Sequence, residues 1–310
     1  MMENIDCRHL LMLIMIPAML VSGCKSGNRG APARIDDGWS EKREGEAEPF
    51  SRIYHLYPSP AEMLSIIDMA EMNFDGQLLF PVTKADQYLD TKSRTHMLGI
   101  YMADLAYAAL FGRHEATLDY LEVVRSLAGE IRIDQAVDEK MIRKARNNVE
   151  YLDSLYTISN EAFMGILDFC ERNERLNTVV MLSAGAFTES LYLAANLVDD
   201  YQEADYLLQH LADQKYTIDN FMSFAESVGK DDRNVASTID DLKRIRQIYE
   251  NIDPGSGEVI VSASKDPVNE LSKKLVIGSG GEQSQPSMTR QEFEELKAAV
   301  IELRTKIVES

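Results

Sequence analysis

Apolar residues recur every three or four positions through most of this 310-residue chain, and that spacing constrains the fold more than any other feature. Segments that alternate apolar and polar residues, as half-buried strands do, are scarce. The pattern therefore predicts an all-α body over residues 53–253, a helical bundle of paired helical hairpins. The clearest stripe runs through Val235, Ile239, Leu242, Ile245, Tyr249 and Ile252.

The limits of several helices follow from residues that begin and end helices. Ser59, Pro60 and Glu62 form a capping-box sequence that opens the first helix. Gly112 is placed to close the long helix that begins at Thr91. We expect the remaining helices at 84–89, 115–129, 135–156, 161–171, 177–198, 202–213, 217–228 and 234–252.

Two of these helices carry related sequences. Gly99–Ala109 aligns without gaps with Gly185–Ala195, and each copy continues through a turn into a second helix. There Asp119–Leu121 matches Asp205–Leu207. Small residues gather on one side of each copy, which lets another backbone approach closely. The pattern predicts an internal duplication.

Part of the first copy resembles a known repeat. The stretch from Leu105 to Leu121, with Ala106, Tyr107, Gly112, Glu115 and Ala116, resembles one helical hairpin of the tetratricopeptide family. The family's Trp-Leu-Gly opening and closing proline are absent, and the copies do not follow its period of roughly 34 residues. The resemblance therefore implies paired hairpins and not a repeat array.

The N-terminal residues indicate a cellular address. Arg8 and His9 precede an apolar run, 10–21, which is shorter than the roughly 20 residues that a membrane-spanning helix needs. Its length and flanks are typical of a signal peptide. The run ends in Val21-Ser22-Gly23-Cys24, which resembles the lipobox of bacterial lipoproteins. The resemblance implies that residues 1–23 are removed and that Cys24 carries a lipid group whose acyl chains include palmitate.

The next residues, 24–52, are polar and charged, with scattered glycine and proline. We expect them to form a flexible lipidated tether. Two or three acyl chains hold a protein stably on a bilayer. Lys25 follows the cysteine in place of an aspartate or an acidic run, which favours an outer membrane lipoprotein facing the periplasm. The whole pattern is similar to uncharacterised helical lipoproteins of Bacteroidetes, and that resemblance implies no activity.

Composition excludes some functions. The formal net charge of −19 repels phosphate backbones, so we expect no nucleic acid partner.

Once Cys7 is removed and Cys24 lipidated, Cys170 is the one cysteine left, so no internal disulfide is expected. Cys170 shares a helical stripe with Phe163 and Ile166, which predicts a buried side chain and not a catalytic thiol.

The chain changes character after residue 253. Residues 254–287 read as a linker, with short strands expected at 258–262 and 275–277. Thr289 and Glu292 then cap a separate C-terminal amphipathic helix within 288–310. Its apolar seam either meets a partner, through an envelope protein or self-association, or folds back on its own domain. The seam consists of Phe293, Leu296, Val300, Leu303 and Ile307.

No phosphate-binding loop, HExxH sequence or paired-cysteine motif occurs, and the histidines are dispersed. We therefore expect no cofactor, no metal site and no catalysis. The best candidate ligand-binding residues are Asp104 and Glu189, with Tyr101, Tyr107 and Tyr192 nearby. A carboxylate among apolar residues is costly unless it has a partner. The two acids either bind a cation or polar ligand, or accept hydrogen bonds from tyrosine hydroxyls or backbone and fix helix register.

Together these patterns favour a lipid-anchored envelope protein that acts as a non-catalytic interaction or scaffold module. The alternative is a small-ligand or cation binding protein that uses a cavity around Asp104 and Glu189.

Overall fold

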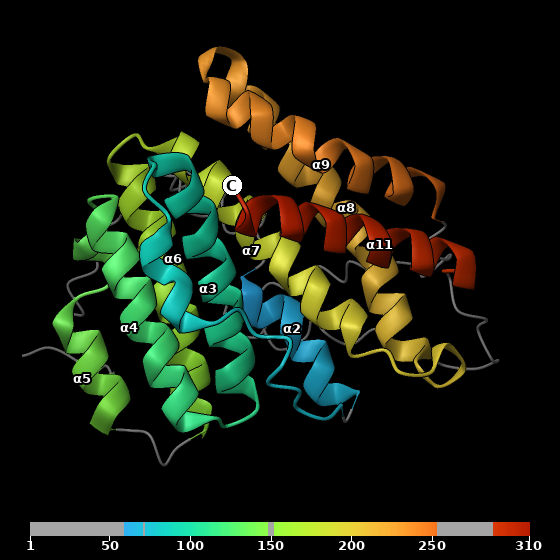
Figure 1. Ribbon diagram of the computed structural model, residues 1–310, viewed down its shortest axis with the longest axis horizontal. Helices are drawn as coiled ribbons and strands as arrows, with labels where there is room; N and C mark the ends of the chain where they lie inside the picture. The colour runs from blue at the N-terminus through green and yellow to red at the C-terminus, as the bar shows by residue number, and fades with distance from the viewer. Residues whose placement is uncertain (1–58, 71, 148–151, 253–287) are drawn as a thin grey trace, which may run out of the picture. The chain divides into compact units, whose positions relative to one another are not determined.

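The computed structural model describes residues 59–70, 72–147, 152–252 and 288–310 (Figure 1). All of them belong to one compact unit, residues 47–310. The predicted signal peptide, Cys24, the tether and the strands expected within 254–287 lie outside the described residues. The C-terminal helix belongs to the same unit as the helices before it, although it is separate from them in sequence.

Helices make up the regular structure of the described part of the chain, which contains no strand, so the predicted all-α fold is confirmed. Short 3-10 helices connect several α-helices: η1 (Val82–Gln87), η2 (Asp134–Ala136), η3 (Tyr201–Glu203) and η4 (Gly229–Asp231). The α-helices are α2 (Pro60–Met69), α3 (Thr91–Leu110), α4 (His114–Glu130), α5 (Glu139–Asn147), α6 (Leu152–Arg172), α7 (Leu176–Asn196), α8 (Asp205–Val228), α9 (Arg233–Asn251) and α11 (Arg290–Val308).

Local sequence sets where several helices begin and end. At the start of α2 the Glu62 amide donates to Ser59 Oγ at 3.1 Å, and the Ser59 amide donates to Glu62 Oε2 at 3.0 Å. Thr289 and Glu292 form the same reciprocal box at the start of α11. Gly112 follows α3 with φ of 61°, a left-handed conformation that glycine adopts at little cost. These three predictions are confirmed.

Two predicted helix breaks were wrong. A single helix, α6, crosses the expected gap at 157–160, and α8 crosses the gap at 214–216. Neither gap holds a glycine or proline, so nothing there stops the helical hydrogen bonding. Ile158 and Ile218 continue the buried face of their helices. The polar residues in the gaps reflect which face is solvated and not an interruption of the helix.

Helices α3 and α7 form the centre of the fold and touch through their backbones. A Cβ atom added to Gly99 would lie 2.1 Å from the Leu182 carbonyl oxygen. A Cβ atom on Gly185 would lie 2.1 Å from the His96 carbonyl oxygen. Each glycine of the duplicated segment therefore lets the other helix approach, and the close contact predicted from the small residues is confirmed.

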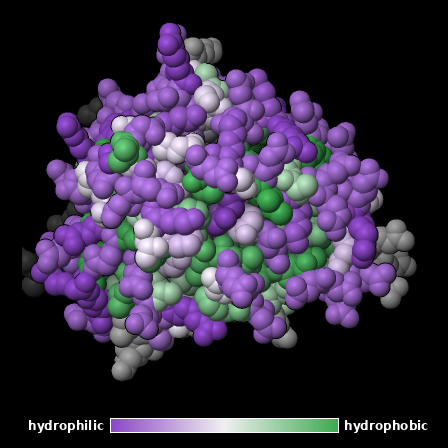
Figure 2. Space-filling model, viewed as in Figure 1, coloured by the Kyte–Doolittle hydropathy of each residue, from purple (hydrophilic) through white to green (hydrophobic). Residues whose placement is uncertain are grey.

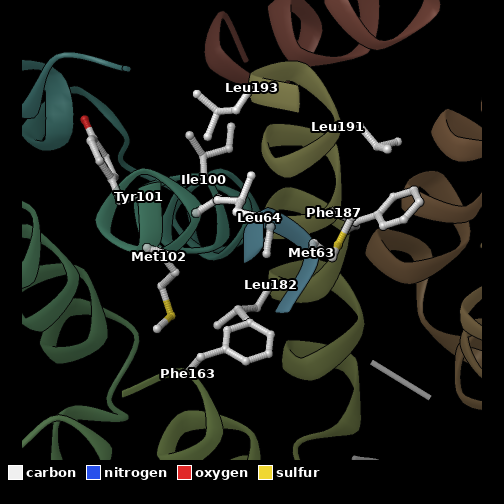
Figure 3. Packing of buried hydrophobic residues seen from close by; sticks show 14 of the residues in the cluster. Met63, Leu64, Ile100, Tyr101, Met102, Phe163, Leu182, Phe187, Leu191 and Leu193 are labelled. Atoms are coloured by element: carbon white, nitrogen blue, oxygen red, sulfur yellow. The ribbon is translucent and has the colours of Figure 1, made fainter. Parts of the chain in front are cut away.

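Other helices pack around this pair. Figure 3 shows Met63 and Leu64 of α2 lying between α3 and α7, while Phe187 points from α7 away from α3. Phe163 of α6 lies beside Leu182 of α7 (Figure 3). These side chains are all at least nine-tenths buried. Hydrophobic burial against both duplicated helices thus supplies the main cohesion of the unit.

The C-terminal helix α11 packs on α7, α9 and α3 (Figure 1). Its apolar seam faces the other helices of the same chain. Of the two alternatives that the sequence left open, the structure therefore shows the helix folded back on its own domain. None of the five seam side chains is open to a partner in this structure. Their exposed fractions are 2% for Phe293, 1% for Leu296, 0% for Val300, 6% for Leu303 and 5% for Ile307.

Among the described residues one helix, α7, is long and apolar enough to cross a membrane. Other parts of the same chain bury 94% of its apolar window. Its length and composition are therefore weak evidence for a membrane span.

Candidate functional site

The two candidate acids meet in the middle of the unit. Asp104 on α3 and Glu189 on α7 are both 0% exposed. Each lies just over one turn beyond the glycine at which its helix touches the other, so the close backbone contact brings the two side chains together. Their carboxyl groups lie close enough for each to affect the pKa of the other. We call these two residues the carboxyl pair.

Arg304 of α11 fills the position opposite Glu189. Its Nε donates to Glu189 Oε2 at 2.6 Å, and its Nη2 donates to Glu189 Oε1 at 2.8 Å. The same Nη2 reaches the Leu78 carbonyl oxygen at 3.3 Å. The arginine side chain is only 14% exposed, so this bidentate pair is largely shielded from water. Such fork-shaped pairing adds direction as well as energy.

Two aromatic rings flank the guanidinium. Its central carbon lies 4.0 Å from the centroid of the Tyr192 ring and 5.6 Å from that of Phe80. A planar, weakly hydrated guanidinium stacks favourably on aromatic faces. Arg304 is therefore held both at its nitrogen atoms and on its flat surface.

The other candidate tyrosines hold the backbone of the segment 72–81, which lies over the site. Tyr101 donates its hydroxyl to the Pro81 carbonyl at 3.0 Å, and the Tyr107 hydroxyl accepts the Asp75 amide at 3.0 Å. Tyr120 donates to the Phe80 carbonyl at 2.8 Å. These tyrosines thus fix the segment that supplies Phe80 and the Leu78 carbonyl.

Burial controls the protonation of the carboxyl pair. Asp104 Oδ2 accepts the Phe80 amide at 3.1 Å, whereas no donor reaches Oδ1. Burial, and then the charge of Glu189, raise the pKa of Asp104 well above its ordinary value. Burial therefore favours the protonated form of Asp104 over the charged form.

The rest of the cluster carries balanced charge. Burial raises the pKa of Glu189, and the hydrogen bonds and charge of Arg304 oppose this rise without cancelling it. Burial would lower the pKa of Arg304, but its hydrogen bonds to Glu189 and the nearby acids raise it. In the ion pair the carboxylate of Glu189 and the guanidinium of Arg304 balance each other's charge, which favours their burial.

Sequence reasoning found the acids and tyrosines but missed Arg304, Phe80 and Tyr120. The only signal for Arg304 was its place in the helix: it directly follows Leu303 of the seam, at the edge of the buried face. Both acids have hydrogen-bond partners within the chain. Their partners are a backbone amide and an arginine, and not tyrosine hydroxyls.

Other reactive side chains have ordinary packing roles. Cys170 is fully buried, and burial raises the pKa of its thiol to about 11. His96 Nε2 bonds Thr238 Oγ1 at 3.0 Å, and His210 Nε2 lies 3.1 Å from the Met63 carbonyl. Within the described ranges, no group of three or more His, Cys, Asp or Glu side chains is arranged to hold a metal ion.

Comparisons with protein-family models, with curated proteins and with solved structures find no match for this chain. Any function must therefore be argued from the chain's own residues.

Proposed function

We propose that this chain is a lipid-anchored, non-catalytic interaction or scaffold protein of the bacterial cell envelope. One observation carries the proposal: the strongest chemical candidates in the sequence are engaged with the chain's own Arg304 and backbone. They join α3, α7, α11 and the segment 72–81 into one body. A firmly joined helical body at the end of a lipidated tether suits the presentation of a surface to another envelope protein.

The outer surface offers apolar side chains for such a partner. Leu89 is 78% exposed and Tyr216 is 59% exposed. Figure 2 shows apolar residues gathered in the middle of one face and surrounded by hydrophilic ones. Exposed apolar surface with a polar rim is typical of protein interaction sites.

The proposed membrane anchor is tested at Cys24. The substitution Cys24→Ser removes the thiol that would carry lipid, so labelling with a palmitate analogue should disappear. The variant should also leave the membrane fraction. Cys170→Ser serves as the matched control because that thiol is buried and is not part of the lipobox sequence. Unchanged labelling of Cys24→Ser would overturn the lipoprotein proposal.

The interaction role is tested by cross-linking in membranes, followed by purification of the chain. The unaltered chain should capture one defined envelope protein, and Leu89→Asp with Tyr216→Asp should reduce that capture several-fold. Lys140→Asp, a charge change at another exposed position, should not. If capture is the same with all three chains, the apolar side chains are not the contact surface.

A second candidate is binding of a cation or small ligand at the carboxyl pair. The observation that favours it is that a cationic group, the guanidinium of Arg304, already lies there. Changing Asp104→Asn and Glu189→Gln together discriminates the two roles. A lost ligand-induced thermal shift with an unchanged melting temperature would indicate ligand binding, whereas a large fall in melting temperature would indicate structure alone.

A further inference from the structure

The contact between α11 and the rest of the unit is specified by charge. Glu302, Arg304 and Lys306 on α11 pair with Arg244 of α9, Glu189 of α7 and Asp241 of α9. Along α11 these charges are negative, positive and positive, and each one meets a partner of opposite sign. The Lys306–Asp241 distance is 2.6 Å. A shift of α11 that placed Arg304 opposite Arg244 would bring like charges together, which disfavours that register.

The part of this contact that receives Arg304 is complete without α11. Glu189, Asp104, Tyr192, Phe80 and the Leu78 carbonyl all come from residues 78–192. The tyrosine hydroxyls that fix the segment 72–81 belong to the same part of the chain. The body therefore builds an acceptor pair and two aromatic walls in advance, and α11 adds only the arginine.

The chemistry of this site fits a guanidinium better than an ammonium. Two nitrogen atoms of Arg304 reach the two oxygen atoms of Glu189, and a third contact runs to a carbonyl. A lysine is a point charge without this planar fork, and its ammonium is more strongly hydrated. Arginine is thus the side chain for which the acceptors and rings are arranged.

We propose that the carboxyl pair, with Tyr192 and Phe80, is a guanidinium-binding site that recognises Arg304 of a docked α11, and that the α11 of a second copy of this chain can occupy it. The connection between α9 and α11 includes the 35 residues 253–287. Fully extended they reach about 115 Å, well beyond a single helix length. Two copies held on one membrane, as the proposed function has it, would exchange α11 reciprocally.

The first test is chemical rescue. In Arg304→Ala the carboxyl pair loses its partner, so the melting temperature should fall. Guanidinium or methylguanidinium at tens of millimolar should then raise it by a few degrees, because a ligand that binds only the folded state stabilises it. Methylammonium at the same ionic strength should not. Arg244→Ala, which removes the neighbouring exposed ion pair, is the matched control and should show no rescue.

An equal response to both cations, or the same response in Arg304→Ala and in the control, would overturn the guanidinium site. If Arg304→Ala does not fold, the second test decides with Arg304→Lys, which keeps the charge.

The second test supplies α11 in trans. A fluorescent peptide of residues 288–310 should bind the Arg304 variants more tightly than it binds the unaltered chain, whose own α11 competes for the groove. The peptide carrying Arg304→Lys should bind about tenfold more weakly, as expected when one charge-assisted hydrogen bond is lost. A peptide carrying Glu294→Gln, a change on the exposed face, should bind like the native one.

Equal binding of the Lys and Arg peptides would overturn the recognition of arginine. No binding of any peptide would overturn the exchange with a second copy. Both tests use purified chain without any envelope partner, so their failure is distinct from failure of the proposed function.

Discussion

Helix α7 contacts α3 and α11 in chemically opposite ways. Against α3 the contact is close, because Gly185 and Gly99 lack the side chains that would keep the backbones apart. Against α11 it combines an apolar seam with a buried, charge-balanced pair between Glu189 and Arg304. The contact with α3 depends on two glycines that have no Cβ atom, whereas the contact with α11 depends on a pair of opposite charges. The α3–α7 contact should therefore fail through steric overlap, and the α11 contact through an unpaired charge.

The largest effect is expected from Arg304→Ala. It leaves the Glu189 carboxylate buried without its partner, and breaking a buried pair in this way costs about 3–5 kcal/mol. Urea unfolding followed by circular dichroism measures the loss. The double change Arg304→Met with Glu189→Leu should recover much of the stability because no charge remains buried. If the double variant is as unstable as the single one, the loss is due to packing and not to charge.

A slightly smaller effect is expected from Gly185→Ala. Its Cβ would overlap the His96 carbonyl oxygen, so the two helices must separate, at a cost of about 3 kcal/mol. The matched control is Gly129→Ala in α4, where the nearest atom to the new Cβ lies 4.0 Å away. That change should be neutral or stabilise by up to about 1 kcal/mol, as alanine favours helix. Equal unfolding free energies for the two variants would contradict the close contact.

The α3–α7 crossing should also respond to pH through His96. Burial, and then the charge of Lys92, lower its pKa to about 4 in the folded protein, against the opposing effect of Asp241 and Asp90. An unfolded histidine has a pKa of about 6.5, so the unfolded chain takes up the proton first as the pH falls. The free energy of unfolding should therefore be about 2 kcal/mol lower at pH 5 than above pH 6.5, because protonation of His96 favours the unfolded chain.

The contribution of His96 is measured by comparing the unfolding free energies of the unaltered chain and of His96→Gln at several pH values. The glutamine cannot take up a proton, so the difference between the two chains should change between pH 7 and 5. A constant difference would show that His96 does not titrate in this range.

The smallest effect is expected at the exposed part of the α11 contact. Arg244 and Glu302 have side chains that are 58% and 69% exposed, so water screens their attraction. A double-mutant cycle with Arg244→Ala and Glu302→Ala should give a coupling energy of about 0.5 kcal/mol or less. A coupling above about 2 kcal/mol would mean that this pair, and not Arg304, anchors the helix.

The candidate site could be predicted only in part. Asp104 and Glu189 stood out because acids among small and apolar residues need partners. Their common location was not evident, since they lie on helices far apart in the sequence. Arg304 was harder to find, because an arginine beside an apolar seam is usually solvated. Only the packing of α11 on α7 turns it into a buried partner.

Local sequence patterns are enough to predict the helical class and several helix ends. The stripes of apolar residues, the boxes at Ser59 and Thr289, and the glycine after α3 all act over a few residues. The sequence also marked the duplicated glycines as sites of close approach. The tertiary structure alone decided that the C-terminal seam faces its own body and that two acids share one arginine. Helix ends depend on neighbouring backbone groups, whereas burial and pairing depend on which distant surfaces meet.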